Sequence, residues 1–387
     1  MVSAHDDRRR ATGAGRTLAA LLAGATLLAS CAGLRTAFGG TPALKDVFSD
    51  AFLVGAAISE AQLIRDDRGA LKIVRQQYNS ISPENVMKWE VMHPLPRTYD
   101  FRAADRYVTF GERHGMFIVG HTLVWHSQTP AWVFEDSAGK PLGRDSLLAR
   151  MRDHIFTVVG RYRGRVGGWD VVNEALADDG TLRDSPWRRI IGDDYIALAF
   201  RYAHEADPDA ELYYNDYSLE EPAKRAGAVR LLLSLHAQGV PITAVGMQEH
   251  NKMELPTSEQ VDTTITILSG TGVHVAITEL DVDVLPLALS SGGADVGMRA
   301  SGSPRLNPWT KRLPVPVEHA LADRYGDLFR VYWRHRDVID RVTFWGVRDS
   351  DSWLNNWPVA GRTNYPLLFD RHGQPKPAFA AVVRVAR

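Results

Sequence analysis

Two glutamates in this chain follow short runs of β-branched and apolar residues. Glu174 ends the string Trp169-Asp-Val-Val-Asn-Glu, and Glu279 ends the string Ile277-Thr-Glu. Such a pair can cleave a glycosidic bond: one carboxylic acid protonates the leaving oxygen, and one carboxylate meets the oxocarbenium-like carbon. Because a single glutamate at a strand end is more often part of a surface ion pair, this hypothesis requires both glutamates to reach one cleft.

Other groups that could assist this chemistry also stand at the ends of apolar runs. They are His121, Trp125 and His126 in one run, Asn173 beside Glu174, Gln248 and His250 in another, Asp281 beside Glu279, and Trp345 in the last run. Residues two apart on a strand face the same side, so we expect Gln248 to point with His250. For the same reason Asp281 should point with Glu279. Two carboxyl groups accompanied by imidazole, amide and indole groups favour a catalytic cleft over unrelated ion pairs.

Eight short β-rich segments, each followed by a stretch with helical signals, would position these groups. We expect strands at Phe52–Ser59, near Tyr78–Ile81, and at Met116–Trp125, Val166–Leu176, Glu211–Leu219, Ile242–His250, His274–Val282 and Arg341–Asp349. Strands that alternate with helices indicate a parallel sheet, and eight such units fit a closed barrel better than an open sheet. The sequence therefore predicts an α/β protein with a single (β/α)8 TIM barrel, whose catalytic groups meet at one end.

Several classes of function find no support in the sequence. The formal net charge of −1 gives no electrostatic basis for binding nucleic acid, which depends on clustered Lys and Arg. No glycine-rich phosphate fingerprint follows the first predicted strand, which argues against a dinucleotide-binding fold. His121 and His126 are five apart, so on a strand they would face opposite sides rather than share a metal. We expect no cofactor, no metal and no nucleic-acid partner.

The first 31 residues are typical of an export signal. A basic segment that ends at Arg16 precedes the apolar run Thr17–Leu28, which is too short to span a membrane as a stable helix. The chain's only cysteine, Cys31, ends the string Leu28-Ala-Ser-Cys, which resembles the lipobox of bacterial lipoproteins. That resemblance implies lipidation of Cys31 and a cell-envelope lipoprotein, periplasmic or anchored to the outer membrane. The alternative is a simple secretory signal with an incidental cysteine, and both interpretations export the protein.

Three regions follow this signal. Residues 32 to about 45 are small and polar and predict a tether, and residues 46–387 hold the predicted barrel. A Gly-, Ser- and Pro-rich loop at about 287–316 follows the seventh strand, which places it at the face where barrel enzymes carry their active sites. The loop either shapes the cleft or is a solvated insertion, and the sequence leaves both interpretations open.

Six strings, in order, resemble the motifs of the glycoside hydrolase family ten xylanases. They are Glu84-Asn-Val-Met-Lys-Trp, Gly120-His-Thr-Leu-Val-Trp-His, Trp169-Asp-Val-Val-Asn-Glu, Gly246-Met-Gln-Glu-His, Ile277-Thr-Glu-Leu-Asp and Phe344-Trp-Gly-Val. The match covers nearly the whole chain after residue 45. The resemblance implies endo-acting, retaining hydrolysis of β-1,4-xylosidic bonds in xylan and xylo-oligosaccharides through a covalent glycosyl-enzyme intermediate. It makes Glu174 the acid/base and Glu279 the nucleophile.

The same resemblance implies supporting roles. Asp281 would orient His250 against the nucleophile, and Asn173 would hydrogen-bond the 2-hydroxyl of the sugar at the cleavage site. Glu84, Asn85, Lys88 and His121 match positions that hold hydroxyls of the non-reducing-side sugars, Trp345 and Trp353 would present flat faces to sugar rings, and Trp125 and Gln248 complete the predicted site. For Trp89 we expect a place in the core rather than a sugar platform.

Glu174 must begin the reaction protonated. We expect the ionised Glu279 beside it to raise its pKa by like-charge repulsion. Two alternatives remain for the function: a related barrel glycosidase that acts on β-1,4-glucan, and a non-catalytic, lipid-anchored glycan-binding protein. A pure binder would have no chemical need for both carboxyls together with His250 and Asn173. The expected assembly is a monomer, whose only membrane contact would be the N-terminal lipid.

Overall fold

The computed structural model describes residues 41–65, 68–288 and 296–387. Contacts divide the chain into residues 1–42 and a unit from Ala43 to Arg387, which contains every helix and strand described below. The predicted export signal and Cys31 lie outside the described residues. Within the described part of the chain, no helix combines the length and the hydropathy that a membrane crossing requires.

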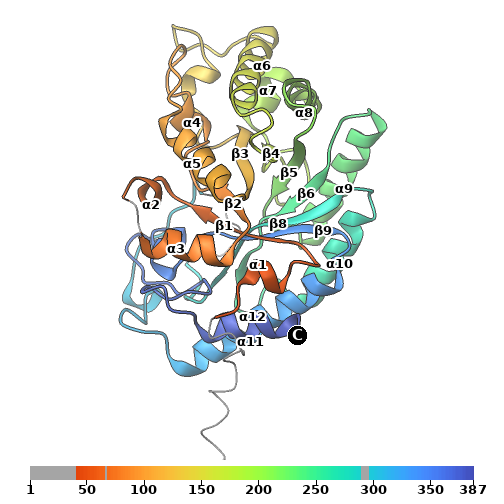
Figure 1. The fold of residues 1–387 in the computed structure, drawn as a ribbon. Helices are drawn as coiled ribbons and strands as arrows, with labels where there is room; N and C mark the ends of the chain where they lie inside the picture. The colour runs from red at the N-terminus through yellow and green to blue at the C-terminus, as the bar shows by residue number, and fades with distance from the viewer. Residues whose placement is uncertain (1–40, 66–67, 289–295) are drawn as a thin grey trace, which may run out of the picture. The chain divides into compact units, whose positions relative to one another are not determined.

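Eight parallel strands close into a barrel (Figure 1). They are β1 (Leu53–Ile58), β2 (Ser80–Pro83), β3 (Phe117–Trp125), β4 (Gly168–Asn173), β5 (Glu211–Asp216), β6 (Ala244–Met247), β8 (His274–Asp283) and β9 (Ile339–Phe344). Neighbouring strands pair in parallel, and the pairings of β1 with β9 and of β6 with β8 close the ring. The predicted (β/α)8 barrel is therefore confirmed, and each strand overlaps the segment from which it was predicted.

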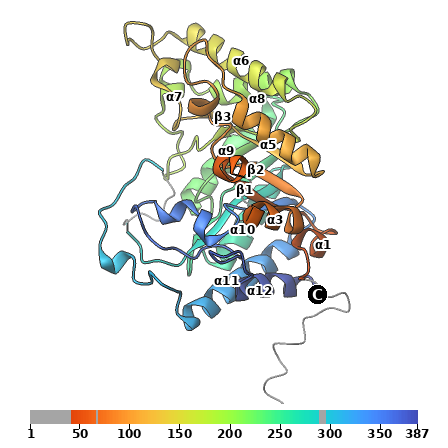
Figure 2. The same ribbon diagram turned by 60° about the vertical axis from the view of Figure 1, so that its left-hand side comes forward.

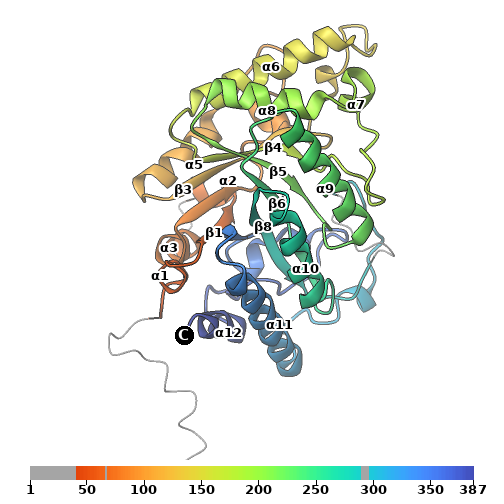
Figure 3. The same ribbon diagram turned by 90° about the vertical axis from the view of Figure 1, so that its right-hand side faces the viewer.

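Helices surround these strands (Figure 3). They are α1 (Leu44–Val47), α2 (Glu60–Ile64), α3 (Arg68–Gln77), α4 (Trp89–Met92), α5 (Arg102–Arg113), α6 (Arg144–Arg161), α7 (Pro186–Ile191), α8 (Tyr195–Ala206), α9 (Pro222–Ala237), α10 (Ser258–Ser269), α11 (Val315–Arg334) and α12 (Pro377–Val385). Ser59 and Thr257 form capping boxes with Gln62 and Gln260 at the starts of α2 and α10. Proline opens α7, α9 and α12, where its missing N–H removes no hydrogen bond from the helix.

The barrel unit begins earlier than the sequence suggested. Leu44 in α1 is fully buried, and its backbone N–H donates to Gln77 Oε1 at 3.0 Å. Phe48, directly after α1, packs on Phe329 of α11 with ring centroids 5.3 Å apart. Figure 2 shows α1 close to the last two helices of the chain. Residues 43–45, which the sequence placed in the tether, therefore belong to the barrel unit.

The sixth predicted strand is two strands in the structure. β6 ends at Met247, and the short strand β7 (His250–Lys252) pairs with β8. Between them Glu249 adopts a left-handed conformation with φ +60°, which turns the chain out of the barrel wall. Gln248 and His250 therefore do not lie on one strand, as was expected, but both side chains line the same cleft.

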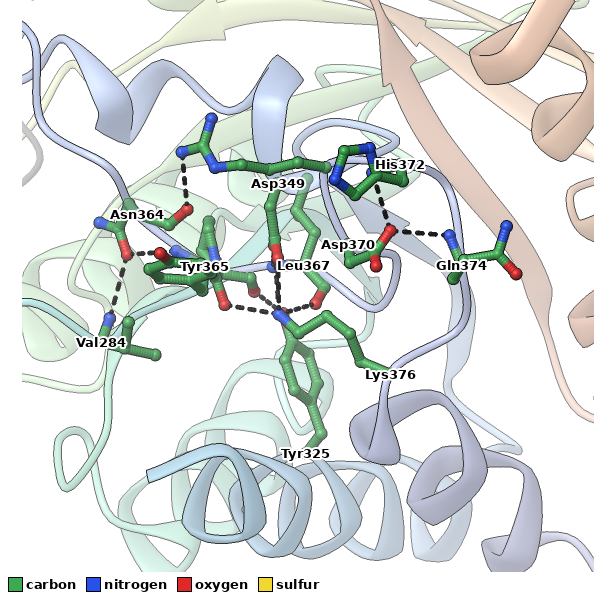
Figure 4. Close-up of polar contacts among 12 residues, drawn as sticks. Val284, Tyr325, Asp349, Asn364, Tyr365, Leu367, Asp370, His372, Gln374 and Lys376 are labelled. Carbon is green, nitrogen blue, oxygen red and sulfur yellow. Dashed lines mark hydrogen bonds and ion pairs between the residues drawn. The ribbon is translucent and has the colours of Figure 1, made fainter. Parts of the chain in front are cut away.

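A buried lysine anchors the segment between β9 and α12 (Figure 4). Lys376 Nζ lies 3.0 Å from Asp349 Oδ2. It also donates to the carbonyl oxygens of Tyr365 and Leu367, each at 2.7 Å. Asp349 Oδ1 accepts the backbone N–H of Leu367 at 2.9 Å, which ties both ends of the segment together. These bonds fix the stretch of chain that carries Trp353 to the mouth of the barrel.

Candidate active site

One cleft at the C-terminal ends of the strands collects most of the predicted site residues. Its volume is about 470 Å³, and it is lined by Glu84, Asn85, Lys88, His121, Trp125, Asn173, Glu174, Gln248, His250, Glu279, Trp345 and Trp353. Asp281 lies behind this lining, where it contacts His250 and Trp353. Ser127, Gln128, Val296, Arg299, Asn356 and Trp357 also line the cleft and were not predicted as site residues.

Glu174 lies directly after β4, and both oxygens of its carboxyl group are held. Trp125 Nε1 donates to Oε2 at 2.9 Å, and Gln248 Nε2 donates to Oε1 at 3.1 Å. The residue has a left-handed φ of +56°, and its backbone N–H donates to the carbonyl oxygen of Asn215 at 2.8 Å. Only 4% of its surface is exposed. These contacts fix the orientation of the carboxyl group at the wall of the cleft.

Burial raises the pKa of Glu174, and the negative charge of Asp216 on β5 raises it further. The hydrogen bonds from Gln248 and Trp125 oppose this shift, and the charge of Glu279 adds a smaller increase. The predicted direction of the pKa shift is therefore confirmed. The predicted cause, repulsion from Glu279, contributes to the shift but is not its main cause. The main cause is that the carboxyl group is almost completely removed from water, where its charged form would be solvated.

Glu279 lies within β8 and faces side chains that stabilise its charged form. Asn215 Nδ2 donates to Oε1 at 2.9 Å, and His250 Nε2 lies 3.1 Å from Oε2. Burial alone would raise the pKa of Glu279. The hydrogen bond from His250, together with the charges of His121 and His250, outweighs burial and brings the pKa below its ordinary value. Glu279 is therefore ionised at neutral pH.

His250 carries a positive charge between two carboxylates. Its Nε2 faces Glu279, and its Nδ1 lies 3.1 Å from Asp281 Oδ2. Burial lowers the pKa of His250, but the charges of Asp281 and Glu279 and the hydrogen bonds to them outweigh burial and raise the pKa to about 10. Trp353 Nε1 donates to the same Asp281 oxygen at 2.8 Å and holds that carboxylate in place. The geometry agrees with the arrangement that the family resemblance implies for Asp281 and His250.

Asn215, which the sequence interpretation missed, joins the two halves of the site. Its Nδ2 donates to Asn173 Oδ1 and to Glu279 Oε1, both at 2.9 Å. Its own Oδ1 accepts the hydroxyl hydrogen of Thr278 at 2.6 Å. Gly246 leaves room for this side chain, because a Cβ there would lie 2.3 Å from Asn215 Oδ1. The signal was a polar residue that follows two tyrosines in the middle of the fifth predicted strand, Glu211–Leu219.

Lys88 organises the polar residues that follow β2. Its Nζ donates to Asn85 Oδ1 at 2.9 Å and to Gln128 Oε1 at 2.7 Å. Burial lowers the pKa of Lys88 and raises that of Glu84, and the attraction between the two charges partly offsets both shifts. Fixed donors and acceptors of this kind can orient the hydroxyl groups of a neutral sugar. Gln128 was not predicted because it falls just outside the motif that ends at His126.

His121 on β3 is supported from behind by a carboxylate on β4. Its Nδ1 lies 2.8 Å from Asp170 Oδ2, and both side chains are buried. The ring meets Trp345 edge-on, with centroids 5.5 Å apart and an interplanar angle of 74°. Because Nδ1 faces Asp170, Nε2 is the ring nitrogen that His121 can offer to a ligand.

Indole rings form another part of the lining. Trp345 faces the cleft, and Trp353 stacks on Trp357 with centroids 4.5 Å apart and an interplanar angle of 22°. Trp357 was not predicted, because no motif string reaches it. Trp89 is 2% exposed and stacks on His154 at 3.6 Å, so its expected place in the core is confirmed.

The described part of the loop at 287–316 reaches the cleft. Val296 and Arg299 are among the lining residues, which favours the cleft-shaping interpretation over a solvated insertion. The backbone N–H of Ala300 donates to the carbonyl oxygen of Pro358 at 3.0 Å, so this loop rests on the chain segment that follows Trp357.

Comparison with known proteins matches this geometry to one family. Residues 43–385 match the family model described as glycosyl hydrolase family 10. An endo-1,4-beta-xylanase A of Xylanibacter ruminicola is 46% identical over 344 residues, which cover 89% of this chain and 93% of that protein. An endo-1,4-beta-xylanase of Geobacillus stearothermophilus is 42% identical, over 89% of this chain and 98% of that protein.

Solved structures lead to the same family. The structure of a GH10 endoxylanase retrieved from a sugarcane soil metagenome matches with a TM-score of 0.86 and 47% identity, covering 88% of this chain and 99% of that one. A mutant structure in complex with xylotriose matches with a TM-score of 0.79 and 38% identity, covering 89% of this chain and 99% of that one. From the model match over nearly the whole barrel unit and from these relatives, the chain belongs to glycosyl hydrolase family 10.

Proposed function

We propose that Glu174 is the acid/base and Glu279 the nucleophile with which this chain hydrolyses xylan. The chain is an endo-1,4-β-xylanase that cleaves β-1,4-xylosidic bonds with retention of anomeric configuration, as its family membership establishes. The observation that carries the division of roles is that the two buried carboxyls of one cleft have pKa values shifted in opposite directions. Such a pair supplies one proton donor and one anionic nucleophile at the same pH.

In the first step, Glu279 attacks the anomeric carbon while Glu174 gives its proton to the leaving glycosidic oxygen. The bond from the anomeric carbon to that oxygen breaks, and a new bond to the Glu279 carboxylate forms. Trp125 and Gln248 hold the donor carboxyl throughout. The part of the xylan chain that carries the leaving oxygen then departs with the proton that Glu174 supplied, and the other part stays bound to Glu279.

In the second step, Glu174 removes a proton from water, whose oxygen attacks the anomeric carbon and displaces Glu279. Esterification of Glu279 removes its charge, and with it one of the influences that raise the pKa of Glu174. Burial and the charge of Asp216 persist through this step. Between the half-reactions the pKa of Glu174 therefore falls by the contribution of the Glu279 charge, while burial and Asp216 continue to raise it.

The supporting residues have roles that follow from their contacts. We assign His250 and Asp281 to keep Glu279 ionised and oriented, because the imidazolium spans the two carboxylates. Asn173 would meet the 2-hydroxyl of the reacting sugar, while Asn215 holds both Asn173 and Glu279 in place. The sugars on the non-reducing side would be held by Glu84, Asn85, Lys88 and His121, with Trp345 and Trp353 against their ring faces.

Replacing Glu279 with Ala tests the nucleophile. The variant should lose hydrolysis of xylan while it still binds xylo-oligosaccharides, because the remaining cleft residues are intact. Release of reducing sugar and binding calorimetry with xylohexaose measure the two properties, and Glu254→Ala, at an exposed loop position, is the control. Undiminished turnover by Glu279→Ala would remove this residue from its proposed role.

We also propose that the protein is exported and held at the cell envelope by a lipid on Cys31. The apolar run Thr17–Leu28 and the string that ends at Cys31 support this proposal. Replacing Cys31 with Ser should release the protein from the membrane fraction into the soluble fraction. Variant protein that stays with the membranes would contradict lipidation. That result would not bear on the catalytic roles proposed for Glu174 and Glu279.

A further inference from the structure

The backbone that carries Glu174 is in an unfavourable conformation. Its φ of +56° lies in the left-handed region, which few residues other than glycine adopt without strain. A residue keeps such a conformation only when its surroundings impose it. The backbone N–H of Glu174 is fixed by the carbonyl oxygen of Asn215, which leaves the carbonyl side of the residue to be held by another group.

Arg183 holds that carbonyl side. Its Nε donates to the carbonyl oxygen of Glu174 at 3.0 Å, and its Nη2 donates to the carbonyl oxygen of Leu176 at 3.1 Å. The same Nη2 donates to the hydroxyl oxygen of Tyr217 at 2.8 Å. The backbone N–H of Arg183 donates to the carbonyl oxygen of Ala175 at 2.7 Å. One residue therefore contacts three consecutive peptide units directly after β4.

These contacts are built into a tight loop. Leu176 and Leu182 form an isolated antiparallel bridge, so the chain folds back and brings Arg183 beside Glu174. Gly180 turns the loop with a φ of +78°, and it packs so closely on α9 that a Cβ would lie 2.1 Å from the carbonyl oxygen of Ala223. Tyr217 directly follows β5, so Arg183 links the loop after β4 to the loop after the neighbouring strand.

We propose that Arg183 is a positioning residue that aims the carboxyl group of Glu174 at the glycosidic oxygen. Arg183 Nε donates to the backbone carbonyl oxygen of Glu174, a contact that orients the residue. The planar guanidinium fixes the directions of Nε and Nη2 relative to each other, which makes it a rigid clamp across two carbonyls. This inference rests on the proposed role of Glu174 as the acid/base.

Replacing Arg183 with Ala releases the carbonyl oxygens of Glu174 and Leu176, and the backbone can relax towards a commoner conformation. The carboxyl group of Glu174 then moves relative to Trp125 and Gln248. Because proton transfer depends on placement to within about 1 Å, we expect the steps that need Glu174 to slow roughly 10- to 100-fold. Arg183→Lys should lose less, because an ammonium group can still reach one of the carbonyls.

The experiment compares two substrates that differ in their need for a proton. Values of kcat/KM are measured on xylohexaose, whose leaving group must be protonated, and on a dinitrophenyl xylobioside, whose leaving group departs as an anion. Arg183→Ala should lose the stated factor on xylohexaose and lose little on the aryl glycoside. The control is Arg189→Ala, an exposed arginine of the same region that pairs with Asp184 at 3.1 Å.

Glu174→Ala in the same assay separates this inference from the proposed function. If Glu174→Ala discriminates between the substrates and Arg183→Ala does not, the positioning role is wrong and the acid assignment stands. If neither discriminates, the acid assignment itself is wrong. Equal losses by Arg183→Ala on both substrates would indicate a general structural role and overturn the proposal. If Arg183→Ala fails to fold, as judged by its thermal melting, the same comparison is decided with Arg183→Lys.

Discussion

At the residue scale, identical side chains behave differently because their neighbours differ. For Glu174, burial and the negative charge of Asp216 favour the protonated form, and they outweigh the hydrogen bonds from Gln248 and Trp125, which favour the charged form. Glu279 is equally buried, but it receives a hydrogen bond from the imidazolium of His250 and another from Asn215. Hydrogen bonds and nearby positive charge therefore decide which of two buried carboxyls is ionised.

The negative charge of Asp216 is predicted to move the alkaline limit of activity to higher pH, because it raises the pKa of Glu174. It is fully buried and pairs with Lys224 at 2.8 Å, and its charge is the second influence that raises the pKa of Glu174. Asp216→Asn removes that negative charge and leaves the positive charge of Lys224, so the pKa of Glu174 should fall. Because the acid must be protonated in the free enzyme, the alkaline limb of kcat/KM against pH should move to lower pH.

The control for this profile is Asp209→Asn, at an exposed position before β5. Thermal melting of both variants at one pH shows whether the fold is kept. An alkaline limb that stays in place, or moves to higher pH, in folded Asp216→Asn would contradict the role given to the Asp216 charge.

At the element scale, strand ends and the turns after them aim the functional groups. Glu174 lies directly after β4 and Glu249 lies two residues after β6, and both take left-handed conformations. Their sequence neighbours Asn173, Gln248 and His250 line the cleft. Gly246 on β6 leaves the space that Asn215 on β5 fills. Register between neighbouring strands therefore matters as much as the identity of the residue that ends each strand.

The elements themselves were readable in the sequence because alternation of β-rich and helical segments is a local pattern. The split of the sixth strand was not readable, because it depends on Glu249 adopting a conformation that its residue type does not announce. Asn215 and Gln128 were missed because their partners come from distant segments of the chain, and Trp357 was missed because no motif string reaches it. The contribution of Asp216 to Glu174 was missed for the same reason.

The anchor after β9 gives a stability prediction. Lys376 is 6% exposed, and its ammonium group has Asp349 and two carbonyl oxygens around it. Replacing Lys376 with Met leaves a buried carboxylate without its cation, which should lower the free energy of unfolding by about 3–5 kcal/mol. Arg152→Ala, which removes an exposed ion pair with Glu205, is the control and should change it by less than about 1 kcal/mol.

The effect of Lys376→Met should depend on pH. Burial raises the pKa of Asp349 from 3.8 to about 6 even with Lys376 present. A raised folded-state pKa contributes stability that is fully present below the unfolded value and is lost as the pH rises through the folded value. Removing Lys376 raises the folded value further, so the deficit of the variant should be largest near neutral pH and should shrink as the pH falls. A deficit that grows on acidification, measured by urea unfolding, would contradict this.

At the scale of the whole barrel unit, closure of the sheet explains how six short motifs scattered along the sequence become one site. The strands from β3 to β9, or the residues directly after them, bring polar or aromatic groups to the same end of the barrel, where Asn215 of β5 supports the lining from behind. The segment held by Lys376 adds Trp353 and Trp357. The fold and the motif residues were predictable from the chain alone. The charges that make the two glutamates different were not, since they depend on burial and on neighbours across the sheet.

The central claim is that Glu279 forms the covalent bond to the sugar, and it can be tested by trapping that bond. A dinitrophenyl xylobioside with fluorine at C2 reacts in the first step and is slow in the second, because fluorine disfavours the oxocarbenium-like transition state and the leaving group assists only the first step. Mass spectrometry of the digested protein should find one fluoroxylobiosyl group, attached to Glu279. A label on Glu174 or on any other residue, or inactivation without a covalent label, would contradict the assignment.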